Sequence, residues 1–223
     1  MKKIMFNSKY GLDKAVLEGR KTMTRRIINP QPTYDKMKGM YWKGGYYGIG
    51  FDNPNDAYKN FISGTEHDKS CNRYRVGEVI AIAQSYRSIE SYLPLYMREE
   101  YDGYSECLDI SFKTSAGWDN KMFVKARLMP WAIKITNVKV ERLQDITSED
   151  CLKEGIESFS AFGKPESYIF TDNKNKIYPK GWCTKPREAF ALLIDKVSGK
   201  GTWNSNPWVW VYEFELTDNT NKS

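Results

Sequence analysis

Residues 128–156 read LMPWAIKITNVKVERLQDITSEDCLKEGI, and this stretch contains the clearest structural signals of the chain. Hydrophobic and polar side chains alternate over Ala132–Thr136 and again over Val138–Val140. Successive side chains of a strand point to opposite faces of a sheet, so this alternation predicts a strand with one face in the core. We expect the best-defined strand of the chain here.

A short helix should follow this strand. Thr147 lies three positions before Asp150, a spacing that resembles a capping box with Asp in place of Glu. Glu149 and Asp150 also place negative charge in the first turn, where it complements the helix dipole. Gly155 suits the end of the helix because glycine tolerates a left-handed backbone. We therefore predict a helix over about residues 148–154.

Weaker patterns on both sides of this stretch predict the other regular elements. Short apolar runs indicate strands at residues 4–6, within 76–83 after a turn, and within 207–216. Helices are expected just after Gly11 and over residues 185–198. The second helix carries these apolar side chains on one face: Ala189, Phe190, Leu193, Ile194 and Val197.

Two segments interrupt these patterns. Residues 29–73 and 158–184 are rich in polar and aromatic residues without a clear period, so we interpret them as long insertions of loops, with a hairpin in the first. Residues 92–101 and 107–113 are expected to pair as a further hairpin. No repeat and no clear linker divides the chain. Residues 1–223 are therefore predicted to form one α+β, mainly β domain, built on a compact barrel or a strongly curved sheet with short flanking helices.

The composition is typical of a globular protein without a membrane span. Of the 223 residues, 40% are hydrophobic and 28% are charged, and the net charge is +6 with a pI near 8.9. This mild basic bias is compatible with a phosphate-bearing partner but does not require one. The first residues, MKKIMFNSKYG, lack the apolar run of a signal peptide, and no apolar stretch reaches about 18 residues. We expect a cytoplasmic protein.

The sequence gives little support to metal or histidine chemistry. The four cysteines show no CxxC spacing, which argues against a zinc site and favours reduced thiols; they are Cys71, Cys107, Cys151 and Cys183. His67 is the only histidine and lies in an irregular insertion, so a Ser-His-Asp or Cys-His site has no support. Glycine-rich phosphate loops are also absent. We expect no metal and no cofactor.

One cationic cluster remains as a candidate site. Residues 19–27 read GRKTMTRRI and contain Arg20, Lys21, Thr22, Thr24, Arg25 and Arg26. The stretch is expected at a helix-to-loop exit, where Lys21 and Thr24 would share one side of a helical turn. A lysine whose pKa is lowered by burial and by neighbouring cations can act as a general base for a threonine nucleophile. The cluster can also bind phosphate through its arginine and lysine side chains. A third interpretation is a solvated basic turn at the end of a helix, and composition alone favours this one.

Together, several motifs resemble the ASCH family of the PUA-like superfamily. They are GRKTMTRR, a VGE turn before a buried strand, and ERLQDITSEDCLKEGI after a long strand. LMP before the central strand and NPWVWVYEF near the end resemble phage and prophage proteins of this type. The resemblance covers residues 4–28, 74–86, 127–157 and 186–215. It implies a PUA-like β-barrel with flanking helices, a modified nucleoside or RNA as partner, and the cytoplasm of a bacterium or infected host.

The resemblance also implies a reaction. One bacterial branch of the family hydrolyses N(4)-acetylcytidine to cytidine and acetate with a lysine, a threonine and a glutamate, which match Lys21, Thr24 and Glu154 here. Lys21 would deprotonate Thr24 or a water that attacks the acyl carbon, and Glu154 would orient Lys21 or pass the proton to the leaving amine. Arg26 would steady a carbonyl oxygen or a phosphate. The remaining candidates for binding substrate or phosphate are Arg20, Thr22 and Arg25.

The chain departs from the resemblance at Gln84, which stands where long relatives carry a glutamate at the end of a strand. Besides an amidohydrolase, a non-catalytic nucleic-acid-binding module remains open, in which cations hold phosphates and aromatic rings stack on bases. A third alternative is a phage accessory protein that binds a host protein through an apolar patch at residues 41–51. We give the first two nearly equal weight and lean to the enzyme, because Thr24 and Glu154 add nothing to a phosphate grip.

Overall fold

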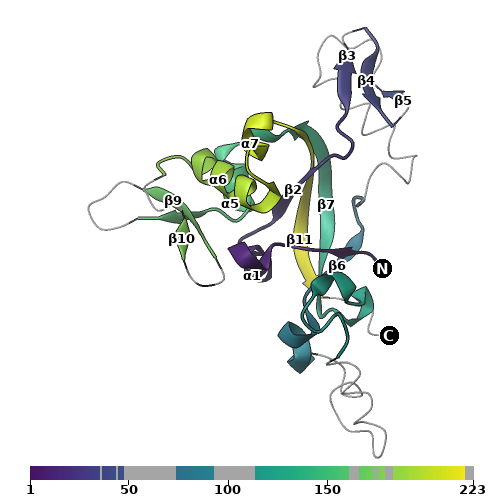
Figure 1. Cartoon of the computed structure of the whole chain (residues 1–223), viewed down its shortest axis with the longest axis vertical. Coiled ribbons are helices and arrows are strands. Elements are labelled where there is room, and N and C mark those ends of the chain that lie inside the picture. The colour runs from purple at the N-terminus through teal and green to yellow at the C-terminus, as the bar shows by residue number, and fades with distance from the viewer. Residues whose placement is uncertain are drawn as a thin grey trace, which may run out of the picture.

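The computed structural model describes residues 1–47 without 36 and 44, 74–92, 114–160, 166–178 without 173 and 175, and 183–218. A five-stranded sheet forms the centre of this part of the chain (Figure 1). Its order is β1 (Lys3–Ile4), β6 (Val79–Ile82), β7 (Trp131–Arg142), β11 (Trp208–Asp218) and β2 (Met23–Ile27). Only β1 and β6 pair in parallel; the other neighbours are antiparallel.

The predicted mixed, mainly β character is confirmed, but the described strands form open sheets. The edge strands of the main sheet, β1 and β2, do not pair with each other in the described part of the chain, so no closed barrel is formed there. The long pair β7 and β11 gives the sheet its length, and its register shifts between Glu213 and Phe214. Such an irregularity bends a strand and increases its local twist.

The strand predicted from the alternating pattern is β7. Ile133 and Ile135 are fully buried, whereas Lys134 and Thr136 between and after them are exposed. The C-terminal strand β11 differs, because every residue of Trp208–Tyr212 is buried. β11 has a hydrogen-bonded neighbour on each side and is covered on both faces, which explains its nearly continuous apolar sequence.

The helices lie beside this sheet (Figure 1). They are α1 (Leu12–Leu17), α5 (Ser148–Lys153), α6 (Pro186–Ser198) and α7 (Thr202–Ser205). The predicted cap of α5 is confirmed, since Thr147 Oγ1 accepts a hydrogen bond of 3.1 Å from the backbone N–H of Asp150. The predicted apolar face of α6 is buried at Ala189, Phe190, Leu193 and Ile194. None of the described helices has both the length and the apolar character that a membrane span needs.

Both predicted insertions contain small antiparallel sheets. In the first, β3 (Thr33–Asp35), β4 (Gly39–Trp42) and β5 (Gly45–Tyr47) form a three-stranded meander that extends the expected hairpin (Figure 1). The second contains β9 (Ser167–Thr171) and β10 (Ile177–Tyr178), which join β8 (Glu157–Phe159). Several predicted features lie outside the described residues. They are almost all of the hairpin at 92–101 and 107–113, much of the 41–51 patch, and His67, Cys71 and Cys107.

Short 3₁₀ segments connect the larger elements: η1 (Ser8–Tyr10), η2 (Tyr86–Tyr92), which is kinked at Ile89, η3 (Lys121–Phe123), η4 (Ala126–Leu128) and η5 (Leu143–Asp145). The segment with η3 and η4 packs against β6 through a second apolar cluster that includes Tyr86, Val124 and Met129. Lys3 stabilises the position of this segment, because its Nζ donates a hydrogen bond of 2.9 Å to the carbonyl oxygen of Val124. The arrangement brings η3 next to the chain that follows β1.

The predicted helix-to-loop exit at residues 19–27 is right for residues 19–22, which follow the end of α1, and wrong for the rest. Met23–Ile27 is not a helix-to-loop exit but the edge strand β2, in which Thr24 lies opposite Tyr212. Lys21 precedes the strand, so Lys21 and Thr24 do not share a helical turn. Two arginines within β2 made a strand hard to recognise, because the partners that allow Arg25 to be buried lie far away in the sequence.

Candidate active site

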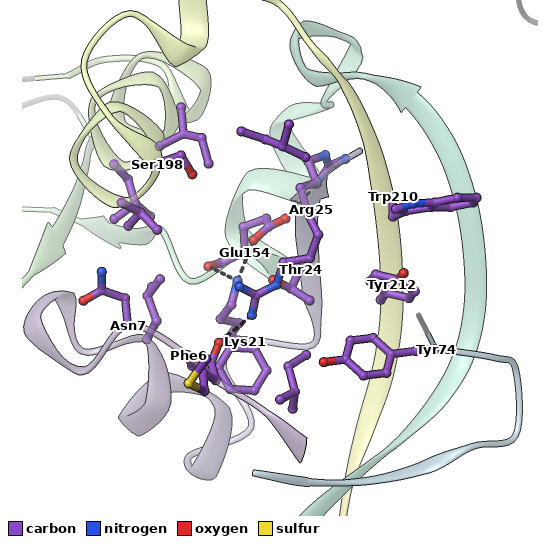
Figure 2. A pocket seen from close by; sticks show the side chains of 18 of the residues that line it. Phe6, Asn7, Lys21, Thr24, Arg25, Tyr74, Glu154, Ser198, Trp210 and Tyr212 are labelled. Carbon is purple, nitrogen blue, oxygen red and sulfur yellow. Dashed lines mark hydrogen bonds and ion pairs between the residues drawn. The ribbon is translucent and has the colours of Figure 1, made fainter. Parts of the chain in front are cut away.

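A cavity of about 1060 Å³ lies on the side of the sheet that faces the helices (Figure 2). β2 and β11 form one wall, and α1 and α6 contribute apolar side chains to the opposite one. Residues 4–9, which connect β1 to η1, form part of its edge. Five of the predicted site residues line this cavity: Lys21, Thr24, Arg25, Arg26 and Glu154.

Lys21 is buried at the inner end of the cavity, with 2% of its surface exposed. Its backbone N–H donates to the carbonyl oxygen of Ala15 at 2.9 Å, which holds the turn between α1 and β2. Its Nζ donates to Glu154 Oε2 at 2.5 Å and to the Glu154 main-chain oxygen at 2.8 Å (Figure 2). The amine therefore has a fixed position and a carboxylate partner.

The environment of Lys21 lowers the pKa of its amine. Burial is the largest cause, because removal from water disfavours the charged form. The charge and hydrogen bond of Glu154 act in the opposite direction, while the positive charges of Arg26 and Arg25 lower the pKa further. A buried lysine with a lowered pKa is more readily neutral and can accept a proton, as general-base catalysis requires.

Glu154 reaches the cavity from the C-terminal end of α5. Its backbone N–H still donates to the carbonyl oxygen of Asp150 at 2.9 Å, and Gly155 then turns the chain with a φ of 100°. Its Oε1 accepts a hydrogen bond of 3.2 Å from Arg25, while Oε2 binds Lys21. The carboxylate, 5% exposed as a residue, thus bridges two buried cations.

Arg25 is surrounded by carboxylates. Its Nε and one terminal nitrogen donate to Glu141 Oε1 at 2.9 and 2.5 Å, and the same nitrogen donates to Asp150 Oδ2 at 2.8 Å. Burial alone would lower the pKa of Arg25, but the charges of Glu154 and Glu141 outweigh it and raise that pKa. The guanidinium of Arg25 therefore stabilises the site, and most of its N–H donors are already used by protein carboxylates.

Thr24 and Arg26 complete the group on β2. Thr24 lines the cavity with 4% of its surface exposed, and its hydroxyl has no hydrogen-bond partner within the described part of the chain. Arg26 donates to the main-chain oxygen of Met5 at 2.6 Å, and its guanidinium lies 5.8 Å from the ring centre of Phe6. Because Thr24 lines the cavity, its hydroxyl is available to a molecule bound there.

Arg20 and Thr22 are not brought into the cavity. Arg20 forms ion pairs with Glu18 at 2.7 Å and with Glu157 at 3.1 Å near the surface. The backbone of Thr22 links α5 to the sheet, because its N–H donates to Lys153 and its oxygen accepts from Phe214. Both residues support the turn that carries Lys21, and neither lines the candidate site.

An aromatic wall was missed by sequence reasoning. Figure 2 shows Tyr74, Trp210 and Tyr212 along one side of the cavity. Tyr74 meets Tyr212 edge-on at 5.2 Å between ring centres, and Trp42 meets Trp210 in the same manner at 6.5 Å. Trp42 comes from the first insertion, so that insertion helps to build the site. One signal in the sequence could have indicated this wall. Trp210 and Tyr212 are two positions apart in a predicted strand, and alternate residues of a strand point to the same face.

Gln84 does not take part in this cavity. It follows β6, is 9% exposed, and its Oε1 has no hydrogen-bond partner among the described residues. The carboxylate of the site is supplied by Glu154 instead. In the same described residues, no group of three or more His, Cys, Asp and Glu side chains is arranged to hold a metal ion.

The site therefore combines a buried amine of lowered pKa, a carboxylate in contact with it, a hydroxyl and aromatic rings in one cavity. Such a set can move a proton and attack a carbonyl carbon next to a planar ring system. Comparisons of the chain with protein family models, with curated proteins and with solved structures give no match.

Proposed function

We propose that this protein is an amidohydrolase that removes an acyl group from the exocyclic amine of an N(4)-acylated cytidine. The observation that carries the proposal is the contact of 2.5 Å between buried Lys21 and Glu154, in a cavity that Thr24 also lines. The resemblance of GRKTMT to the ASCH motif supports the same assignment. The proposal includes a PUA-like fold, for which the mixed sheet with its neighbouring helices is the support.

In the proposed reaction, neutral Lys21 accepts a proton from the nucleophile. The nucleophile is a water molecule or the Thr24 hydroxyl, and its oxygen forms a bond to the acyl carbon while the carbonyl electrons move to oxygen. When the carbonyl re-forms, the bond from carbon to N4 breaks, and N4 takes the proton back from Lys21. Cytidine leaves with a free amine, and the acyl group leaves as a carboxylate, after a second water attack if Thr24 was acylated.

Glu154 and Arg25 have supporting roles in this scheme. Glu154 accepts the hydrogen bond of Lys21 and stabilises the ammonium that forms during the proton transfer. Arg25 holds Glu154 at 3.2 Å and is a positioning residue. The rings of Trp210 and Tyr212 provide flat apolar surface, on which a pyrimidine can pack.

The test is hydrolysis of N(4)-acetylcytidine by the purified protein, followed as cytidine release by chromatography. We expect release by the wild type and its loss in Lys21→Met, which keeps the side-chain volume but has no amine. Lys14→Met is the matched control, because Lys14 lies on nearby α1 with 71% of its side chain exposed. An acetyl group found on the Thr24 peptide after rapid denaturation would identify the threonine as nucleophile. Equal rates in wild type and Lys21→Met would contradict the proposal.

A second candidate function is a nucleic-acid-binding module without catalysis. It is favoured by the excess of cations in the cavity lining, where Glu154 is the single carboxylate among the described residues. Cations and aromatic rings in one groove are typical of proteins that bind single-stranded RNA. Salt-dependent binding of oligoribonucleotides by a folded protein that releases no cytidine would favour this alternative.

A further inference from the structure

The cavity is strongly cationic. Its described cationic lining residues are Lys2, Lys9, Lys21, Arg25, Arg26, Lys43 and Lys121. Internal ion pairs account for some of this charge: Glu154 is shared by Lys21 and Arg25, and Lys2 pairs with Glu78 at 2.9 Å. Of the other described cations, Arg26 and Lys121 lie beside residues 5–8, away from the Lys21–Glu154 pair.

Lys121 is the first of these two cations. It belongs to η3, and its Nζ donates to the main-chain oxygen of Phe6 and, at 2.7 Å, to Ser8 Oγ. Arg26 donates to the preceding main-chain oxygen, that of Met5, at 2.6 Å. An amine from η3 and a guanidinium from β2 are therefore held on adjacent peptide groups at the edge of one cavity.

The two cations affect one another. Burial is the largest cause of the lowered pKa of Lys121, Asp13 opposes the effect, and the positive charge of Arg26 lowers that pKa further. Within the described residues no carboxylate lies within ion-pair distance of Lys121. An anion between the amine and the guanidinium would relieve their repulsion, and such charge-assisted hydrogen bonds are the strong ones.

We propose that Lys121, Arg26 and Ser8 form a subsite for a phosphate group, so that the substrate is a phosphorylated N(4)-acylcytidine. This inference rests on the proposed function and narrows its substrate class. The phosphate is that of a mononucleotide or that of a nucleotide within RNA. The volume of about 1060 Å³ supports the inference, since it is at the upper end of ordinary ligand sites and leaves space beside a nucleoside.

The test compares three substrates: N(4)-acetylcytidine, its 5′-monophosphate, and a short oligoribonucleotide with one N(4)-acetylcytidine. We expect the wild type to have a kcat/KM about tenfold or more higher for at least one phosphorylated substrate than for the nucleoside. That ratio should fall toward one in Lys121→Met and persist in Lys121→Arg. Lys125→Met is the matched control, because Lys125 is exposed four positions later in the same segment. Which phosphorylated substrate is preferred separates the mononucleotide from RNA.

Wild-type ratios near one for both phosphorylated substrates would overturn the inference while leaving the amidohydrolase intact. A ratio that stays high in Lys121→Met, in a protein with an unchanged melting temperature, would also overturn it. If no substrate is hydrolysed, the proposed function fails, and calorimetric binding of cytidine and cytidine 5′-monophosphate decides on the subsite. Tighter binding of the monophosphate that depends on Lys121 would support it, and equal binding would refute it.

Discussion

Lys21 and Glu154 are 133 positions apart in the sequence, yet the amine of one donates to both the carboxylate and the main-chain oxygen of the other, at 2.5 and 2.8 Å. The double contact fixes the end of α5 against the turn before β2. Because the main-chain oxygen is one of the two acceptors, part of this contact survives a change of the Glu154 side chain. Glu154 variants can therefore report on chemistry without removing the lysine from its place.

The first prediction concerns the pH dependence of the reaction. The rate should rise with pH as Lys21 loses its proton, and level off below the ordinary lysine value of 10.5 because burial lowers the pKa of this amine. Glu154→Gln removes the charge that raises this pKa, so the inflection should move to lower pH while the maximal rate falls. The measurement is kcat/KM against pH for wild type and Glu154→Gln. An inflection that moves upward would show that Lys21 is not the group observed.

Stability should depend on pH through the same lysine. The pKa of Lys21 is lowered in the folded protein, so between that lowered value and 10.5 the unfolded chain binds more protons. The contribution of Lys21 to stability is therefore fully present above 10.5 and is lost as pH falls through the folded pKa. Urea denaturation should show the difference in unfolding free energy between wild type and Lys21→Met growing with pH, by up to about 1.4 kcal/mol per unit within this window. A difference that is constant from neutral pH to 10.5 would contradict the prediction.

Removal of Arg25 should be severe. Arg25→Met leaves the carboxylates of Glu141, Asp150 and Glu154 close together without their common cation. Loss of one partner from a buried ionic group costs about 3–5 kcal/mol. The measurement is the free energy of unfolding of wild type and Arg25→Met, obtained by urea denaturation at pH 7.

Arg87→Met serves as the control for Arg25→Met. Arg87 pairs with Asp119 at 2.9 Å, but its side chain is 62% exposed, so its loss should cost less than about 1 kcal/mol. Both variants are compared with wild type by urea denaturation at pH 7. Similar midpoints for Arg25→Met and Arg87→Met at pH 7 would show that the ionic cluster contributes little.

Gly155 should be hard to replace. Its φ of 100° is strained for any residue with a side chain, and a Cβ there would meet Lys21 Cβ at 3.7 Å. We expect Gly155→Ala to cost about 1–3 kcal/mol and to reduce activity, because the turn positions Glu154. Gly19→Ala is the control: its φ of 73° is nearer to the left-handed helical region and its Cβ would meet open space, so the cost should be about 1 kcal/mol with activity retained. If the two variants changed activity equally, the turn at Gly155 would not be what positions Glu154 in the site.

Cys151 should be unreactive in the folded protein. It is fully buried beside the ionic cluster, and burial is the main cause that raises the pKa of its thiol to about 12. Iodoacetamide at pH 8 should leave the Cys151 peptide unlabelled, as judged by mass spectrometry, and should label it after unfolding in urea. Rapid labelling of the native protein at this position would require an opening of α5 that the structure does not show.

The sequence was most informative where one local pattern decides the structure. The alternation around Ile133 predicted β7, and the capping residue Thr147 predicted α5 with its end at Gly155. The apolar face of α6 was likewise readable from its spacing. In each case the physical cause acts over a few neighbouring residues, so the sequence contains all of it.

Residues with distant partners were not predictable in the same way. Arg25 is a buried strand residue only because Glu141, Asp150 and Glu154 surround it. Likewise, Lys121 reaches the cavity because its segment packs on another strand. Lys21 and Thr24 were candidates from their residue types, Glu154 was selected only through the resemblance to a known motif, and the structure places all three in one cavity. Whether they catalyse a reaction stays a prediction.

The order of strands in the main sheet has a consequence for synthesis. β2 carries Thr24 and is made early, but its hydrogen-bonded neighbour in the described sheet is β11, where Thr24 pairs with Tyr212. A nascent chain still on the ribosome has no strand in this sheet against which β2 can dock until residues 208–218 have been translated. Contacts this distant in sequence also form slowly. The cavity wall formed by β2 and β11 is thus completed only after β11 has been made, and until then the cationic segment 20–26 of a growing chain is open to solvent and to any polyanion nearby.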